Sequence, residues 1–181
     1  MNKSFFNNYL KNISKLILEQ NQHKDKLLEI AKTLKKLKKN KNKLLIFGNG
    51  GSASISSHAS IDFSNNHSLK TMNFSDTSLI TCFSNDYGYE KWMSKAINIY
   101  GQEKDVLLVV SSSGESKNII NACKEAKKKK FDKIITFTGF KKNNSTNKIG
   151  DINIWVNSQS YNFVENTHQI LILSIVDFLK K

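Results

Sequence analysis

The sequence predicts an α/β fold, a three-layer α/β/α sandwich with helices on both faces of a parallel sheet, preceded by an N-terminal helical hairpin. The main observation is that short apolar runs alternate with longer segments of helical periodicity. A second observation is that two of these runs end abruptly in turns rich in glycine or serine. The 181 residues suit a single domain, with the helical hairpin in residues 1–40 and the α/β core in residues 41–181.

Each predicted element has its own signal in the order of apolar residues. Helical spacing predicts two N-terminal helices, one carrying Phe5, Tyr9, Ile13, Leu16 and Ile17, the other Leu27, Ile30, Ala31, Leu34 and Leu37. Continuous apolar runs predict buried strands at residues 43–47, 105–110, 134–138 and 152–156. Further helices are expected at residues 53–63, from the serine-rich turn to about residue 130, and at residues 161–179.

The formal charge of +13 raises the question of a polyanionic partner. Every basic side chain except the histidines is lysine, and the absence of arginine argues against specific reading of nucleic acid. The lysine runs at 35–39 and 127–130 fall where helices would face water, which favours a solvated surface over a functional polyanion site. No apolar run is long enough to cross a membrane or to form a signal peptide.

Cys82 and Cys123 are the only cysteines, so no disulfide framework and no cysteine-based metal cluster is predicted. Together with the missing signal peptide, this favours a cytoplasmic protein without membrane attachment.

The first turn, Gly48-Asn49-Gly50-Gly51-Ser52, follows a strand and opens a helix. Glycines such as Gly50 let backbone N–H groups approach a ligand, and the helix start favours an anion. A tight turn without a ligand is the simpler alternative. A dinucleotide-binding turn is a further one, but it requires an acidic residue after the next strand, and residues 69–74 contain none.

The second turn contains four serines around one glycine, Ser111-Ser112-Ser113-Gly114-Glu115-Ser116, again between a strand and a helix. Hydroxyl groups and a helix N-terminus can hold a phosphate without arginine or lysine. A simple helix cap is the alternative, but a cap needs only one serine. The pattern therefore favours phosphate binding.

Two pairs of ionisable residues are candidates for proton transfer or metal binding. Glu165 and His168 lie three residues apart on one face of the last helix, where a base and an acid could act on a bound sugar. His58 and Asp62 are separated by one helical turn, a spacing compatible with a metal site. Ordinary solvent-facing pairs are the alternative for both.

Six segments occur in the same order as in the phosphoheptose isomerases, which the whole chain resembles. They are GNGGSA at 48–53, His58, NDYGYE at 85–90, SSSGES at 111–116, FTG at 137–139 and the final VENTHQ helix. The resemblance implies a flavodoxin-like SIS domain that forms a homotetramer with active sites at subunit interfaces. It also implies conversion of sedoheptulose 7-phosphate to an aldoheptose 7-phosphate through an enediol, in heptose supply for surface polysaccharide.

The resemblance also assigns roles to individual residues. Ser111, Ser112, Ser113 and Ser116 would hold the phosphate, while Asn49, Ser52 and Asp86 would contact the sugar chain. Asp62 stands where the family has its proposed glutamate base. An isomerase with a rearranged catalytic pair would use Glu165 as base, with His168 or His58 as acid.

No organic cofactor is expected, but the family's zinc site is altered in this sequence. Its set of His, Glu, Gln and His corresponds to His58, Asp62, Glu165 and Leu173, and Leu173 can neither bind a metal nor carry a proton. At most three zinc ligands remain, His58, Asp62 and Glu165. The alternatives to the heptose isomerase are an isomerase of another sugar phosphate, or a non-catalytic protein that binds phosphosugars or acts as an adaptor for the replication initiator DnaA.

Overall fold

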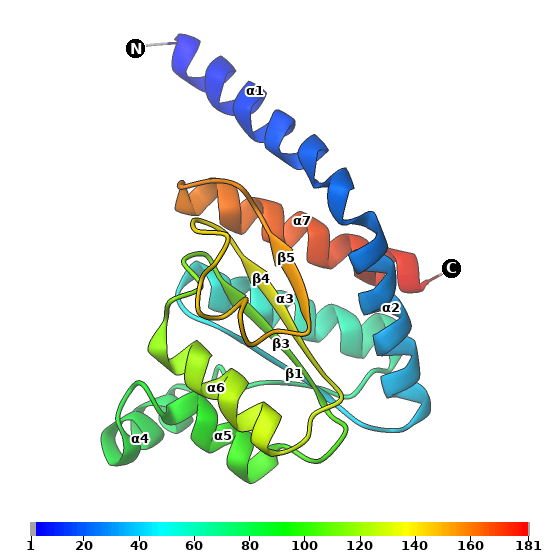
Figure 1. Cartoon of the computed structure of the whole chain (residues 1–181), viewed down its shortest axis with the longest axis vertical. Helices are drawn as coiled ribbons and strands as arrows, with labels where there is room; N and C mark the ends of the chain where they lie inside the picture. Colours follow the sequence, from blue (N-terminus) through cyan, green and yellow to red (C-terminus); the bar gives the residue numbers. More distant parts are fainter. Residues whose placement is uncertain (1–2, 181) are drawn as a thin grey trace.

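A computed structural model describes residues 3–180, which form a five-stranded sheet flanked by helices (Figure 1). All strands are parallel, in the order β2-β1-β3-β4-β5. They are β1 Leu44–Gly48, β2 Thr71–Asn73, β3 Val106–Ser111, β4 Lys133–Thr138 and β5 Ile152–Trp155. After β1, the chain forms β2 on one side of β1 and then crosses to form β3 on the other side of β1. In parallel sheets ligands bind at such a reversal, beyond the carboxyl ends of the strands.

Helices cover both faces of the sheet, which confirms the predicted three-layer α/β fold. Alternate side chains of a strand point to opposite faces, so Leu44 and Ile46 pack in one core cluster while Leu45 and Phe47 pack in the other. The first cluster includes apolar residues of α2 Lys24–Lys39, α3 Gly51–His67 and α7 Tyr161–Leu179. The second includes residues of α5 Trp92–Tyr100 and α6 Lys117–Lys128.

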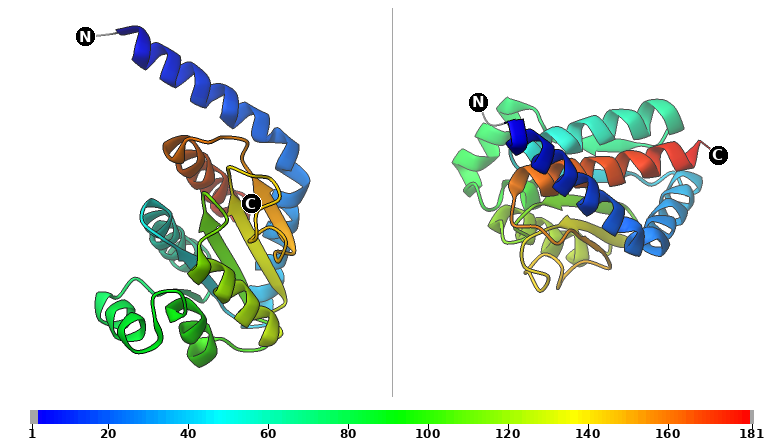
Figure 2. Two further views of the ribbon diagram at one scale, coloured as in Figure 1. Left: turned by 60° about the vertical axis from the view of Figure 1, so that its left-hand side comes forward. Right: turned by 90° about the horizontal axis from the view of Figure 1, so that it is seen from above.

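The N-terminal helices form as predicted but do not fold back on each other as a hairpin. The 3₁₀ turn η1 Gln20–His23 joins α1 Lys3–Glu19 to α2, and the two helices continue in nearly the same sense as one bent arm (Figures 1 and 2). Leu16 anchors the end of α1 against Val156 and Val164. The earlier part of α1 extends beyond the body of the protein, and Phe5, Phe6 and Leu10 are exposed.

Three elements lie in the stretch that the sequence pattern did not resolve, namely β2, α4 Thr77–Tyr87 and α5. Strand β2 has only 3 residues, none of them fully buried, so it carries no apolar run. The last helix was predicted within the bounds that α7 has. Among residues 3–180, no helix is long and apolar enough to cross a membrane.

Candidate active site

The glycine turn after β1 and the serine turn after β3 lie side by side, because these two strands are neighbours in the sheet. Between them is a cavity of about 100 Å³. It is lined by Asn49 and Ser52 from the first turn, Val110, Ser111, Ser112, Ser113 and Ser116 around the second, and Tyr161 and Glu165 from α7. The structure therefore joins both predicted turns and one predicted ionisable residue in one site.

The glycine turn brings the start of α3 against the carboxylate of Glu165. Gly50 has a φ of +54°, a conformation that other residues rarely adopt. A β-carbon on Gly51 would lie 2.3 Å from Oε2 of Glu165, so only glycine permits this approach. The buried Ser52 donates a hydrogen bond from Oγ to Oε1 of the same carboxylate, at 3.0 Å. These contacts fix the position of Glu165 in the cavity wall.

The serine turn presents hydroxyl groups that the protein itself uses little. Ser112 is only 5% exposed, and its Oγ has no hydrogen-bond partner among the described residues. Ser116 is the N-cap of α6, yet its side chain makes no capping hydrogen bond. A buried hydroxyl without a partner is costly in a folded protein, so the Ser112 hydroxyl indicates a site that a ligand completes.

Asn49 is held by two residues to which the sequence analysis assigned no role. Its side-chain amide exchanges two hydrogen bonds with that of Asn118, at 3.0 and 2.9 Å, and its Oδ1 also accepts one from the Tyr89 hydroxyl at 3.1 Å. Asn118 is in the first turn of α6, and Tyr89 belongs to the NDYGYE segment. The segment therefore reaches the site through Tyr89. Asp86, which was predicted to contact the sugar, is exposed, does not line the cavity and, among the described residues, bonds only to Asn85 and Cys82.

His168 is on the same helix as Glu165 but does not line the cavity. Its side chain is fully buried, with Nε2 3.1 Å from the carbonyl oxygen of Thr138 and the ring against Phe137. Burial lowers the pKa of His168 to about 4, although the hydrogen bond to Thr138 acts in the opposite direction. The imidazole is therefore neutral at neutral pH.

His58 and Asp62 form a separate, partly exposed cluster with Gln169 of α7. Nε2 of His58 lies 3.4 Å from Oδ2 of Asp62, and its Nδ1 lies 2.9 Å from Nε2 of Gln169. Neither His58 nor Asp62 lines the cavity that contains Glu165. The described chain thus separates the two pairs of ionisable residues that the sequence analysis identified.

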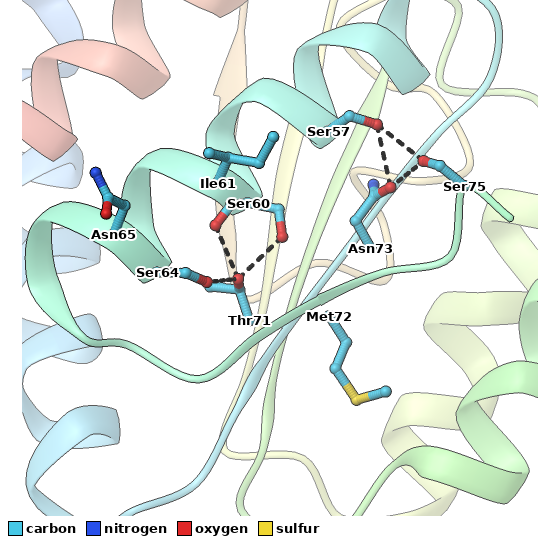
Figure 3. A pocket seen from close by; sticks show the side chains of 9 residues that line it. All are labelled: Ser57, Ser60, Ile61, Ser64, Asn65, Thr71, Met72, Asn73 and Ser75. Carbon is cyan, nitrogen blue, oxygen red and sulfur yellow. Dashed lines mark hydrogen bonds between the residues drawn. The ribbon is translucent and has the colours of Figure 1, made fainter.

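A larger hollow, with a volume of about 830 Å³, lies elsewhere along α3 and the edge strand β2 (Figure 3). It also contains many hydroxyl groups, but these bond to one another. Ser60 and Ser64 both pair with Thr71, and Ser57 pairs with Asn73 and Ser75. Its hydroxyls are already satisfied, whereas the hydroxyl of Ser112 in the smaller cavity is not.

Comparison with known proteins agrees with this architecture. The model of the SIS domain family matches residues 8–139. The phosphoheptose isomerase of Sulfurimonas denitrificans is 30% identical over 93% of this chain and 89% of its own length. The chain belongs to the phosphoheptose isomerase family. The structure of a phosphoheptose isomerase from Francisella tularensis matches with a TM-score of 0.92 and 26% identity, covering 99% of this chain and 98% of that one.

Matches to some members of the family are shorter. The phosphoheptose isomerase of Helicobacter pylori is 39% identical over 94 residues, and the aligned part spans only about half of each chain, 49% of both.

The zinc site that the family implies does not fit the residues of this chain. Zinc in proteins takes nitrogen, sulfur or oxygen ligands, usually four in number. Leu173 offers only carbon atoms and packs against the core, and Glu165 faces Ser52 in the cavity rather than the cluster of His58 and Asp62. Among residues 3–180, no three histidine, cysteine, aspartate or glutamate side chains converge on a common metal position.

The dinucleotide alternative also lacks its acidic residue in the structure. Strand β2 ends at Asn73, and Asp76, the nearest acid, caps α4 by accepting a hydrogen bond from the backbone N–H of Leu79 at 2.9 Å. The carboxylate that would hold ribose hydroxyls is therefore engaged in helix capping.

Proposed function

We propose that this chain is an aldose–ketose isomerase of sugar phosphates, and that sedoheptulose 7-phosphate is its substrate. The relatives from Sulfurimonas and Francisella are named as phosphoheptose isomerases. The observation that carries the proposal is the cavity in which the unpaired hydroxyl of Ser112 and the carboxylate of Glu165 occur together. The hydroxyl can donate a hydrogen bond to a phosphate, and the carboxylate can accept a proton from the sugar.

The serine turn is the proposed phosphate site. Hydroxyls of Ser111, Ser112, Ser113 and Ser116 would donate hydrogen bonds to phosphate oxygens, and the N-terminus of α6 adds the positive end of its dipole. No lysine is among the residues that line this cavity. Binding would therefore depend on hydrogen bonds and the helix dipole, without an ion pair.

Glu165 is the proposed base because it is the one ionisable carboxylate that lines the cavity. Its carboxylate would remove a proton from C1 of the ketose, the C–H electrons would form the C1=C2 bond, and the C2 oxygen would take up a proton. The resulting enediol would then lose its O1 proton and regain a proton at C2 to give the aldose. Ser52 orients the base, and Tyr161 is the candidate for proton exchange with the substrate oxygens.

Incubation with sedoheptulose 7-phosphate in D₂O, followed by NMR, tests this proposal. We expect the aldoheptose product and solvent deuterium at the exchanged carbon. Glu165→Gln should lower kcat by about 10² to 10⁴-fold, because loss of a general base has that cost, while binding of the sugar phosphate is retained. Asp62→Asn is the control. If Glu165→Gln turns over normally and Asp62→Asn does not, the base is Asp62.

A second candidate is a phosphosugar-binding protein without catalysis, which includes the adaptor alternative. It is favoured by Leu173 at the position of a catalytic histidine in the family, and by the burial of His168. Thermal stabilisation by sedoheptulose 7-phosphate without product or deuterium exchange would support it. Product formation would exclude it.

We also propose that the protein is a homotetramer with active sites near subunit interfaces, as the resemblance implies. Its support in this chain is the exposed apolar surface of α1, next to the start of α7 that carries Glu165.

A further inference from the structure

A second pocket, of about 500 Å³, lies between the start of α2 and the loop 139–151 that joins β4 to β5. Three lysines line it, Lys26 from α2 and Lys142 and Lys148 from the loop. Its other lining side chains within the described part of the chain are uncharged amides, His23 and Trp155, with no carboxylate. The size is typical of a small-molecule site, and the charges favour an anion.

Two lysines of this pocket lie close to its two aromatic side chains, those of Trp155 and His23. The ammonium group of Lys142 lies 5.7 Å from the centroid of the Trp155 ring, and His23 Nε2 lies 2.9 Å from the Trp155 carbonyl oxygen. Burial is the main cause that lowers the pKa of His23, and the charges of Lys26 and Lys142 lower it further, against the effect of the hydrogen bond. The indole N–H of Trp155 is buried and has no partner among the described residues.

The same loop braces the serine turn of the proposed active site. Thr146 donates two hydrogen bonds to the carbonyl oxygen of Gly114, from its backbone N–H at 3.0 Å and from its hydroxyl at 2.7 Å. Ser145 donates its backbone N–H to the Glu115 carboxylate at 2.9 Å. Thr146 is fully buried, so its bonds to Gly114 are shielded from water, whereas the bond between Ser145 and Glu115 is exposed. One short loop therefore contributes lysines to the pocket and supports the phosphate-binding turn.

We propose that this pocket is a second anion-binding site, for a phosphorylated small molecule, and that its occupant strengthens the binding of phosphate at the serine turn. The occupant would neutralise like charges on Lys26, Lys142 and Lys148 and would restrict the loop that holds Gly114 and Glu115. A ligand that restricts a loop lowers the ordering cost for a second ligand that needs the same loop ordered. The coupling rests on the proposed function, whereas binding to the pocket does not.

Titration with inorganic pyrophosphate at constant ionic strength, followed by ¹H–¹⁵N NMR, tests the binding. We expect saturable shifts of the amides of residues 142–148 and of the Trp155 indole, and their loss in Lys142→Ala/Lys148→Ala. The matched control is Lys38→Ala/Lys39→Ala, which removes the same charge from the exposed face of α2. Equal weakening by both double variants, or no saturable shift in the wild type, would overturn the proposal.

Kinetics with sedoheptulose 7-phosphate test the coupling. Low pyrophosphate should lower KM by about fivefold in the wild type and in the control, a typical allosteric effect, but should only raise KM by competition in Lys142→Ala/Lys148→Ala. Pyrophosphate binding without a lowered KM would contradict the coupling. Binding to the pocket in a protein with no turnover would instead contradict the proposed function alone, so the two failures are distinguishable.

Discussion

Substitution of Ser112 tests whether its hydroxyl serves ligand binding or the stability of the fold. Because its buried Oγ has no partner among the described residues, Ser112→Ala should raise the free energy of unfolding, by about 1 kcal/mol. The same change should weaken phosphate binding roughly tenfold or more, because a hydrogen bond to a charged group is lost. Isothermal titration calorimetry with the sugar phosphate and chemical denaturation measure the two effects.

Ser64→Ala is the matched control for this prediction, because Ser64 lines the hollow along α3 rather than the cavity. We expect its affinity for the sugar phosphate to equal that of the wild type. A loss of affinity in Ser64→Ala but not in Ser112→Ala would move the phosphate site to the hollow along α3.

The buried His168 makes stability depend on pH. Its pKa is about 4 in the folded protein and 6.5 in the reference state, so the unfolded chain binds more protons between these values. Its contribution is therefore complete above pH 6.5 and is lost as the pH falls toward 4, by about 3 kcal/mol in total. Urea denaturation of the wild type and of His168→Gln across this range measures the difference.

His23 also has a lowered pKa, but it is present in both proteins, so its effect cancels in that comparison. Parallel stability curves for the wild type and His168→Gln would contradict the buried, neutral state of His168. The prediction concerns stability alone, because His168 does not line the cavity.

At the scale of elements, two glycines in the turn between β1 and α3 allow the position of Glu165 and the strain of the backbone to be tested separately. A β-carbon at Gly51 would meet the Glu165 carboxylate at 2.3 Å, so Gly51→Ala should displace the base and lower kcat about 100-fold. Gly51 is the first residue of α3, where alanine should preserve or slightly raise stability. Steady-state kinetics and thermal unfolding distinguish these effects.

In the same turn, Gly50→Ala should strain the backbone without displacing Glu165. Gly50 has a φ of +54°, but no described atom lies within 4 Å of its added β-carbon. We expect a loss of about 1 to 3 kcal/mol in stability from backbone strain, with a smaller loss of kcat than in Gly51→Ala. Full activity of Gly51→Ala would show that the position of Glu165 does not limit the reaction.

Which elements could be predicted depended on how strongly each was buried. Strands β1 and β3 are buried at every position, so their apolar runs were visible in the sequence. Strand β2 is short and half-buried and gave no signal. Spacing placed Glu165 and His168 on one face of α7, but packing against β4 buries His168 and leaves Glu165 in the cavity. Contacts between distant segments, such as Tyr89 with Asn49, have no local pattern.

At the scale of the whole molecule, the strand order explains why a site can form here. The reversal between β1 and β3 brings together two turns that are about 60 residues apart in the sequence. Helix α7 then supplies Glu165 across the first turn through the bond to Ser52. The arm formed by α1 contacts the start of α7, where the ring of Tyr9 lies 4.7 Å from that of Phe163, two residues before Glu165. The arm is therefore in direct contact with the helix that carries Glu165.

The exposed apolar face of the arm leads to a prediction about assembly. Phe6 and Leu10 are 63% and 62% exposed, which is unfavourable for a helix that stays in water. We expect the wild type to have about four times the 20.6 kDa mass of one chain in analytical ultracentrifugation. Phe6→Ser/Leu10→Ser should lower that mass and also reduce turnover, because the start of α7 loses support. Ile99→Ser, at a 50% exposed apolar residue of α5, is the control and should leave both unchanged. A monomeric wild type with full activity would contradict both the tetramer and the dependence of the site on it.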